Sequence, residues 1–500
     1  MLLLGLDIGT TGAKALVFTT EGEQKGYAFQ EYGIINTPEG YAEQDAEQIW
    51  GIAKDVIKKA TAGLGQDIGA LSLSVQGDAV MPIDENRKAI GPVQLGMDYR
   101  GTAEVELCSQ LLGEQQLFEL SGMRPHPMNS IVKVFWALRN TPELYHRAWK
   151  YVTYSDFILG KLGSDEIVID YTQASRTMAF DLSRKCWSAD ILSALGISEE
   201  KLAKPVPSCT VVGTINGQLA AELDLNPGIK LVTGGHDQTC AALGAGIIKE
   251  NMALDSHGTA EVVSTVFKDI RVGSEMYSSY YPCYCSLLKD MYFSFSLNHT
   301  GGMLLKWFAE EFCKADFPEA AKINSSIYQY IFDNMKPEPS KVMVMPYFNG
   351  SGTPTCNLSQ KGAIIGLKLS TDRFDIAKAI VEALSFEIRL NLISLRSAGI
   401  DINELRSVGG GARSPAGLQN KADILGLPVS SLETREAACL GAALAAGLAT
   451  GVYSSAEDAT SIIRIDRTYL PRPEFAKIYD QRFEVYEKLY PALKDISAIL

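Results

Sequence analysis

The amino-acid sequence predicts an α/β protein built from two similar halves, each a mixed sheet flanked by helices. Two observations support this fold class. Strand-like apolar runs alternate with amphipathic helical segments along the chain, and the order of the first elements is repeated from residue 251. The length of 500 residues agrees with two domains, because a single hydrophobic core seldom grows to that size.

The first half opens on three predicted strands and a helix. The runs LLLGLDI, AKALVFTT and GYAFQEYGI each read as a strand, with the turn GTTG after the first. Apolar residues from Ile49 to Ala60 then recur every three or four positions, which predicts a helix with one buried face. A strand at 68–75, helices at 103–112 and 131–139 and a strand at 230–235 follow.

The second half repeats this opening. The segment NMALDSHGTAEVVSTVF, from Asn251, again has an Asp and a Gly-Thr pair in a turn between two apolar runs. A third strand near 285–297 and a long helix at 374–396 follow, and the order strand, helix, strand, Ala-rich helix ends the series. No Pro- or Ser-rich linker separates the halves, so the repeat alone predicts domains 1–247 and 248–500 with a cleft between them.

The composition excludes several classes of protein. Hydrophobic residues make up 46% and charged residues 21%, as in a folded globular chain. Lysine and arginine number 46 against 59 acids, a net charge of −13, which argues against nucleic acid or anionic membrane as the main partner. No apolar run reaches the length of a membrane span, and nine scattered cysteines favour a reduced, cytoplasmic protein. A small anionic ligand such as a nucleotide stays open, because backbone amides can bind phosphate inside an acidic protein.

A turn rich in Gly and Thr lies between the first two strands, in DIGTTGAK at 7–14. Its amides and hydroxyls, including those of Thr10 and Thr11, suit phosphate oxygens. Asp7 could hold Mg²⁺, directly or through water, and Lys14 could bring positive charge to a phosphoryl group. A hairpin whose glycines only make the turn is the alternative. The similar turn DSHGTAE at 255–261 could bind the same polyphosphate from the other side.

Three successive glycines follow a predicted strand in SVGGGARSPAGLQNKAD, from Ser407. Bare backbone here would let a flat ligand lie against the chain. The alternative is a strand–helix turn that needs flexibility. The spacing GGGxxS, late in the chain, disfavours a dinucleotide site, which has GxGxxG after its first strand.

Asp237 lies in GGHDQTCAALGAG, between a predicted strand and a predicted helix. The C-terminal edge of such a strand is where α/β sheets bind ligands, and phosphoryl transfer to an alcohol needs a carboxylate that accepts the hydroxyl proton. The alternative is an N-cap for the following helix, which is the better interpretation of an isolated Asp in this setting. His236 has no sequence partner for catalysis and reads as structural.

Polar side chains suited to sugar hydroxyls follow two other extended segments. Gln76 and Asp78 lie in SVQGDAVMPID, and Asp98 and Arg100 lie in GMDYRG. Carboxylates, amides and guanidinium groups give directional hydrogen bonds to vicinal hydroxyls, so all four are candidate substrate ligands. For Asp98 and Arg100 the alternative is an exposed ion pair of little consequence.

Together these segments resemble the FGGY family of carbohydrate kinases over nearly the whole chain, from Asp7 to Gly447. Two stretches are more specific than a glycine loop: MNSIVKVFWALRN at 128–140 and GAIIGLKLSTDRFDIAKAIVE at 362–382 look like the two signatures of the family. The run GGGARSPAGLQNKAD, with Gln419 and Asp423 at the family's offsets, is similar to its adenosine-binding motif.

The resemblance implies an actin-like (ribonuclease H-like) fold in each half, with ATP and Mg²⁺ in the cleft and closure of the halves over the substrate. It implies that Asp237 is the general base, which reverses the preference for capping, that Asp7 is the carboxylate on the metal side, and that Lys14 contacts the γ-phosphate. A homodimer is common among such kinases. The other residues implied to bind phosphates or nucleotide are Thr10, Thr11, Gly258, Thr259, Gly302, Gly410, Gly411 and Ala412.

The acceptor is less well defined than the reaction, with a pentulose such as xylulose narrowly favoured. The run Gln76-Gly77-Asp78 lacks the histidine usual in xylulokinase- and gluconokinase-like sequences and looks more like the erythritol kinase type, whereas GGHDQ looks more like fuculokinase. A polyol, a deoxysugar and an aldonate therefore stay open. Two interpretations outside the kinases are an actin-like ATPase without an acceptor and an inactive sugar-binding regulator, which should lack the base.

Overall fold

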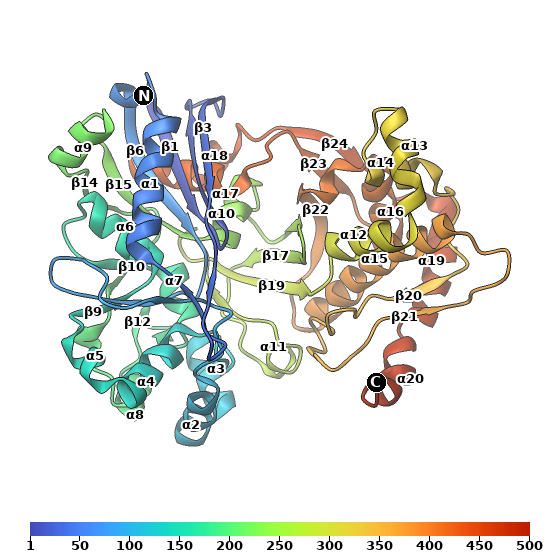
Figure 1. Ribbon diagram of the computed structural model, residues 1–500, viewed down its shortest axis with the longest axis horizontal. Coiled ribbons are helices and arrows are strands. Elements are labelled where there is room, and N and C mark those ends of the chain that lie inside the picture. The colour runs from blue at the N-terminus through green and yellow to red at the C-terminus, as the bar shows by residue number, and fades with distance from the viewer.

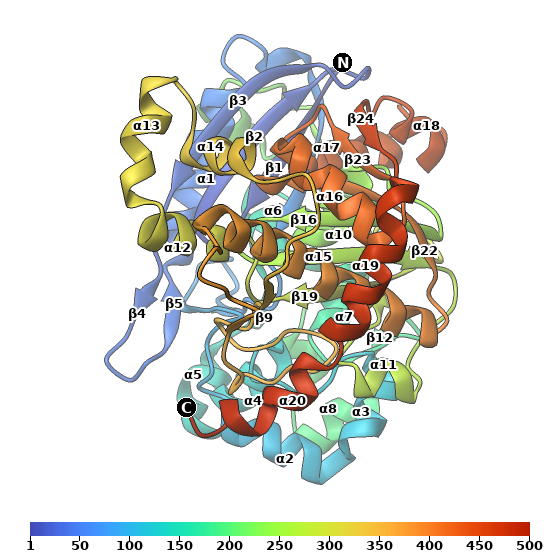
Figure 2. The same ribbon diagram turned by 90° about the vertical axis from the view of Figure 1, so that its right-hand side faces the viewer.

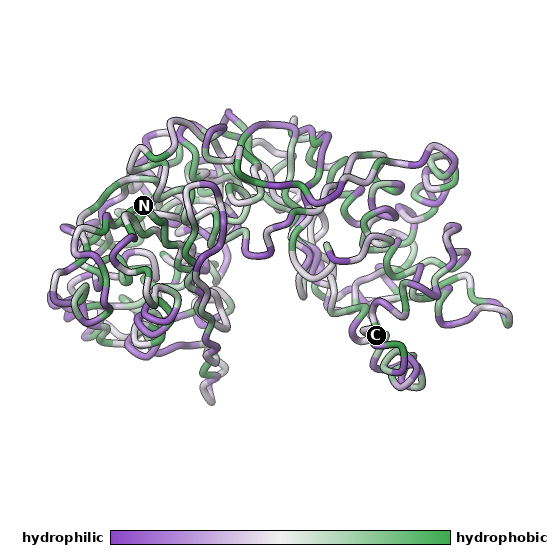
Figure 3. Tube along the Cα trace, turned by 90° about the horizontal axis from the view of Figure 1, so that it is seen from above, coloured by the Kyte–Doolittle hydropathy of each residue, from purple (hydrophilic) through white to green (hydrophobic).

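The computed structural model describes residues 1–500 and has two lobes, each with a mixed sheet covered by helices (Figure 1). Seen from above, the lobes stand side by side and join along one side only (Figure 3). The fold class predicted from the sequence is therefore confirmed. None of the helices combines the length and the apolar character that a membrane crossing requires.

The first lobe is built on a six-stranded sheet. In sheet order its strands are β14 (Val211–Thr214), β15 (Lys230–His236), β6 (Ile68–Val75), β1 (Leu2–Ile8), β2 (Gly12–Phe18) and β3 (Gln24–Glu31). β1, β6 and β15 run parallel, and the strands on either side of them are antiparallel. β1 and β6 are largely apolar and buried because helices cover both of their faces, with Asp7 and Ser74 as polar residues near their C-terminal ends.

The second lobe is built on a seven-stranded sheet. In sheet order its strands are β18 (Tyr284–Cys285), β19 (Tyr292–Asn298), β17 (Glu261–Phe267), β16 (Asn251–His257), β22 (Ile402–Gly409), β23 (Val429–Leu432) and β24 (Ile465–Tyr469). Without β18, the order and the directions of pairing are those of the first sheet. The internal repeat predicted from the sequence is thus present in the fold.

The repeat extends to individual side chains. Asp7 of β1 pairs in register with Ser74 of β6, whose hydroxyl donates a 2.6 Å hydrogen bond to Oδ1 of Asp7. At the matching place, Asp255 of β16 pairs with Ser407 of β22, whose hydroxyl donates to Oδ2 of Asp255 at 2.5 Å. The two halves therefore place one carboxylate each at the end of their first strand, held by a serine of the parallel neighbour.

The helices begin and end at residues that explain their bounds. Asp45 caps α1 (Ala46–Ala60) by accepting from the amides of Glu47 and Gln48, and Asp372 caps the 25-residue α15 (Arg373–Ser397) in a capping box with Asp375.

Nine helices contribute to the surroundings of the site. Besides α1 and α15 they are α4 (Ser130–Asn140), α7 (Tyr171–Arg176), α10 (Asp237–Gly244), α12 (Gly302–Phe312), α14 (Ile327–Asn334), α16 (Pro415–Leu425) and α17 (Ala437–Ala449).

The helix α17 joins the two lobes. It comes late in the chain but packs on β1, β6 and β15 of the first sheet and against α10 (Figure 1, Figure 2). α10 and α17 occupy equivalent places, since each follows the outer of three parallel strands, β15 and β23. A boundary at 247/248 separates the two sheets, whereas α17 crosses it.

Three glycines permit this contact. A Cβ atom on Gly441 of α17 would lie 1.8 Å from the carbonyl oxygen of Cys240, and one on Gly244 of α10 would lie 1.9 Å from that of Ala437. A Cβ atom on Gly5 of β1 would lie 2.0 Å from the carbonyl oxygen of Cys439. Backbone atoms cannot move aside as side chains do, so each position requires glycine.

We expect Gly441→Ala to destabilise the fold by about 1–3 kcal/mol, because the added methyl forces α10 and α17 apart. The matched control is Gly51→Ala in α1, where a Cβ atom meets nothing within 4 Å. That control should be neutral or slightly stabilising, since alanine is the better helix former. Thermal unfolding followed by circular dichroism compares the two, and a Gly441→Ala protein that melts with the wild type would contradict the packing argument.

Candidate active site

Asp237 lies at the C-terminal end of β15 and is the first residue of α10, whereas the N-cap position is occupied by His236. The alternative of an N-cap aspartate is therefore wrong. Its Oδ1 atom is buried and accepts no hydrogen bond, while the side chain as a whole is 34% exposed, so the exposed oxygen is Oδ2. Burial of the carboxylate and the negative charge of Asp7 raise the pKa of Asp237 to about 7, against the opposing charge of Arg176.

Asp7 and Lys14 face each other across the first hairpin. They are direct partners in the β1–β2 register, and burial raises the pKa of Asp7 while Ser74 and Lys14 oppose the rise. The Lys14 ammonium group lies 2.8 Å from Oε2 of Glu436, the residue before α17. Glu436 was not predicted as a site residue, because only the contact between the lobes brings it to the hairpin.

The turn of this hairpin is held by amide side chains. Gln76 donates to the carbonyl of Gly9 at 3.2 Å and accepts from the Thr10 hydroxyl at 3.3 Å. Gln44 donates to the carbonyl of Thr10 at 2.8 Å, while Thr11 is exposed at the tip. Gln76, a predicted substrate residue, is therefore hydrogen-bonded to the Gly-Thr turn that contains the predicted phosphate residues Thr10 and Thr11.

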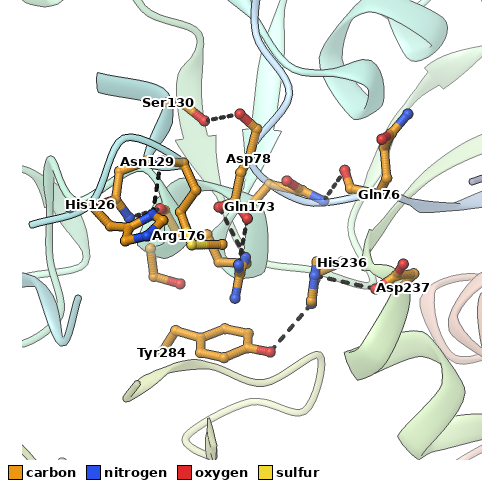
Figure 4. A network of polar contacts seen from close by, with 12 residues as sticks. Gln76, Asp78, His126, Asn129, Ser130, Gln173, Arg176, His236, Asp237 and Tyr284 are labelled. Carbon is orange, nitrogen blue, oxygen red and sulfur yellow. Dashed lines mark hydrogen bonds and ion pairs between the residues drawn. The ribbon is translucent and has the colours of Figure 1, made fainter. Parts of the chain in front are cut away.

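Asp78 is paired with an arginine that the sequence did not single out (Figure 4). Arg176, at the end of α7, donates from Nε and Nη2 to the two carboxylate oxygens of Asp78 at 3.2 and 2.5 Å, and both residues are buried. Gly77 makes room for this pair, because a Cβ atom there would lie 2.8 Å from Nε of Arg176 and 2.7 Å from the ring of His236. A single arginine in the apolar run ASRTMAF was the only available signal.

Asp98 and Arg100 form a buried pair, so the alternative of an exposed ion pair is wrong. Asp98 is fully buried and accepts hydrogen bonds from the Ala42 amide and from the Arg100 amide and guanidinium. The guanidinium lies 4.1 Å from the ring centroid of Tyr41 and 5.1 Å from that of Trp136. This aromatic clamp fixes Arg100 in one orientation.

Lys133 of α4 connects these groups. Its ammonium group is fully buried and donates to the carbonyls of Asp78 at 3.0 Å and Met128 at 2.5 Å. Burial lowers the pKa of Lys133 to about 8, although the charges of Asp78 and Asp98 oppose the shift. The Lys133 ammonium group therefore holds the loop at Asp78 in place through its backbone carbonyl.

A cavity of about 450 Å³ lies in the second lobe and is lined by four of the predicted nucleotide residues. These are Gly258, Gly302, Gly410 and Gly411. Its apolar wall includes Leu305, Phe332, Val381 and Leu384 from α12, α14 and α15. Thr259 is exposed beside Gly258 in the β16–β17 turn, whereas Ala412 lines a neighbouring hollow on the other side of the glycine loop.

A buried lysine lies at the base of this cavity. Lys421 of α16 pairs with Glu261, Nζ to Oε1 at 2.7 Å, and with Asp255. Burial opposes ionisation of Glu261, but the charges of Lys421 and His257 hold the pKa of that carboxyl well below its usual range. Asp255, the counterpart of Asp7, is thus neutralised within the protein.

Comparison with known proteins agrees with this architecture. The model of the FGGY family of carbohydrate kinases, N-terminal domain, matches residues 2–244, and that of the C-terminal domain matches residues 256–450. A xylulose kinase of Staphylococcus epidermidis is 26% identical over 507 residues, covering 100% of this chain and 98% of the relative. A gluconokinase of Bacillus licheniformis is 26% identical over 499 residues, covering 99% and 96%.

Two solved structures share the fold from end to end. The structure of a "xyloylose kinase" from Brucella ovis is 26% identical and superposes with a TM-score of 0.88, covering 99% of this chain and 100% of the other. A gluconate kinase from Lactobacillus acidophilus has a TM-score of 0.89 at 22% identity, covering 98% of each chain. The resemblance stated from the sequence is confirmed, and the chain belongs to the FGGY family of carbohydrate kinases.

Proposed function

We propose that this carbohydrate kinase transfers the γ-phosphoryl group of ATP to a hydroxyl of an uncharged sugar, with a pentulose such as xylulose as the favoured acceptor and Asp237 as the general base. The observation that carries the proposal is the state of Asp237. One carboxylate oxygen is exposed, the pKa is raised to about 7, and Asp7 of the Gly-Thr turn is close enough to contribute to that rise. A base with this pKa is well matched to an alcohol at neutral pH.

In the proposed reaction the acceptor hydroxyl donates to Oδ2 of Asp237. The carboxylate aligns the hydroxyl oxygen with the γ-phosphorus and takes the proton as the new P–O bond forms and the bond to the leaving ADP oxygen breaks. Charge develops on the phosphoryl oxygens in this step. Amides of the turn at Thr10 and Thr11, the turn at Gly258 and Thr259 and the ammonium group of Lys14 are the proposed donors to those oxygens.

The residues at the first hairpin also fit Mg²⁺. Oδ1 of Asp7 accepts from Ser74, and its second oxygen accepts no hydrogen bond from the protein. No group of three or more His, Cys, Asp or Glu side chains is arranged to hold a metal. One carboxylate with phosphate oxygens and waters is the usual set for Mg²⁺, so Asp7 would hold the ion only in part. The ion would neutralise charge on the phosphates.

Gly302, Gly410 and Gly411 are the proposed neighbours of the nucleotide, with Ala412 at the edge of the same loop. The cavity between them has an apolar wall and bare glycine backbone, which suits a flat base and a ribose. Lys421 is already paired with two carboxylates and adds no uncompensated charge there.

The charges of the first lobe favour an uncharged acceptor over an aldonate. Each basic side chain near the candidate substrate residues is already matched: Arg176 by Asp78, Arg100 by Asp98, and Lys14 by Glu436. Lys133 is buried against two carbonyls. Asp7 and Asp237 add negative charge, so the carboxylate of an aldonate would meet repulsion without a free cation to balance it. Xylulose kinases and gluconokinases occur among the relatives at the same identity, so the preference rests on these charges.

We expect Asp237→Asn to lower kcat by about 10²–10⁴-fold, because the hydroxyl proton loses its acceptor while the amide keeps the shape of the side chain. ATP affinity, measured by calorimetry, should stay near that of the wild type. Asp190→Asn, on the exposed face of the helix Ala189–Leu195, is the matched control and should keep full activity. Near-normal turnover in Asp237→Asn would exclude this residue as the base.

The pH dependence of kcat/KM should report the same carboxylate. The base acts only when it is ionised, so kcat/KM should fall as the pH drops through about 7, well above the range of an ordinary aspartate. Asp237→Asn should abolish this acidic limb in whatever activity remains. An acidic limb at pH 4 in the wild type would contradict the raised pKa.

A five-carbon series with a constant chain tests the acceptor class: xylulose, xylitol and xylonate, each assayed by coupled ADP release. We expect kcat/KM for xylulose to exceed that for xylonate by about 100-fold, since an unbalanced like charge costs several kcal/mol. Xylitol separates a ketose preference from a general polyol preference. A preference for xylonate would overturn the charge argument, and rapid ADP release without any acceptor would point to an ATPase.

A further inference from the structure

The imidazole of His236 lies between the candidate base and a tyrosine from the second half of the chain. Its Nε2 atom is 3.2 Å from Oδ1 of Asp237, and its Nδ1 atom is 3.3 Å from the hydroxyl of Tyr284 (Figure 4). His236 is buried and Tyr284 is fully buried. The mechanism above uses neither side chain, and the sequence indicated only a structural role for the histidine.

The ring of His236 is neutral. Burial and the neighbouring charge of Arg176 hold its pKa well below the usual range. A neutral imidazole has one N–H group and one lone pair. Since an ionised carboxylate can only accept hydrogen bonds, the nitrogen that faces Asp237 must carry the proton, and Nδ1 is left to accept from Tyr284. Burial raises the pKa of Tyr284, so its hydroxyl keeps the proton that it donates.

Both ends of this arrangement are fixed by the backbone. The amide of His236 donates to Oγ1 of Thr172 at 2.8 Å, and the absence of a Cβ atom on Gly77 leaves room for the ring. Tyr284 belongs to β18, whose flanking amides at Cys283 and Cys285 donate to Gly122 and Ser175 of the first lobe. The tyrosine hydroxyl is therefore held against the imidazole although it comes from the second half of the chain.

The buried Oδ1 atom of Asp237 accepts no hydrogen bond, although the backbone amide of Gln238 also acts on the carboxylate and lowers its pKa. In this structure the Nε2 atom of His236 is near it but not aligned for a hydrogen bond, and a buried acceptor without a donor is unfavourable. A small rotation of the ring or of the carboxylate would complete the bond. Oδ2 remains exposed for the acceptor alcohol, so the two carboxylate oxygens have separate tasks.

We propose that His236, held by the Tyr284 hydroxyl in the tautomer with its proton on Nε2, is a positioning residue that orients the Asp237 carboxylate and stabilises its ionised form. The proposal rests on the proposed role of Asp237 as the base. His236 and Asp237, at the N-cap and first position of α10, then form a coupled pair. In this pair the histidine acts through its neighbour and does not touch the substrate.

The direction of the effect follows from the charges around Asp237. Removal of the N–H donor should raise the pKa of the base, because its ionised form loses a stabilising contact. The acidic limb of kcat/KM should then move to higher pH, and activity should recover in alkaline buffer. The other charged or titratable groups that face this carboxylate are Asp7, Asp78, Arg176, Cys240 and Tyr284, and they are unchanged in the variants at position 236.

Two amide substitutions give a matched test. In His236→Gln the amide nitrogen can replace Nε2, whereas in His236→Asn the shorter side chain reaches only the place of Nδ1. We expect the acidic limb of His236→Asn to shift upward by about one pH unit, a roughly tenfold loss of kcat/KM below the limb, and that of His236→Gln to stay near the wild type. Tyr284→Phe removes only the hydroxyl and should shift the limb in the same direction as His236→Asn.

The measurements are full pH profiles of kcat/KM with thermal melting of each variant. A merely structural histidine would lower the melting temperature and scale the rate equally at all pH values. An unmoved limb in His236→Asn and in Tyr284→Phe would overturn the proposal, and Tyr284→Phe alone decides it if His236→Asn fails to fold. If Asp237→Asn is inactive but the acidic limbs of His236→Asn and Tyr284→Phe do not move, only this inference is refuted. If Asp237→Asn is active, the proposed function itself is refuted.

Discussion

The close approach of α10 and α17 is the contact on which the rest of the molecule depends. Gly244 and Gly441 remove the side chains that would separate the two helices, and Gly5 removes the one that would hold α17 away from β1. Asp237 begins α10, and Glu436 immediately precedes α17. The place of the candidate base and the ion pair of Lys14 are therefore both set by one backbone-to-backbone contact between the lobes.

The two lobes share one strand order but differ in the surroundings of the equivalent carboxylates, Asp7 and Asp255. In the second lobe Asp255 is neutralised by Lys421, and the space above it is a glycine-lined cavity. In the first lobe Asp7 keeps an oxygen free of protein hydrogen bonds, and its charge raises the pKa of Asp237. A buried charge needs either a protein partner or a ligand, so Asp7 is left available to a ligand whereas Asp255 is satisfied by Lys421.

Much of the fold and part of the site could be predicted from the sequence. The strand at 68–75 was predicted at its observed bounds, and the long helix at 374–396 to within one residue at each end, because their apolar periodicity is strong. Arg176, Glu436 and the Tyr284 hydroxyl were missed. Each acts through a partner that is from about 50 to more than 400 residues away in the sequence, and a local pattern cannot register such a pairing.

The sequence by itself determined the α/β class, the repeated halves, the glycine turns and the family, because these depend on local periodicity and on short runs of residues. Tertiary structure alone decided that the side chains of Asp98 and Arg100 are buried, that Asp78 is matched by Arg176, and that His236 faces both Asp237 and Tyr284. The physical reason is that burial and charge balance depend on tertiary contacts between segments that are distant in the sequence. The packing of the two lobes determines which of these contacts form.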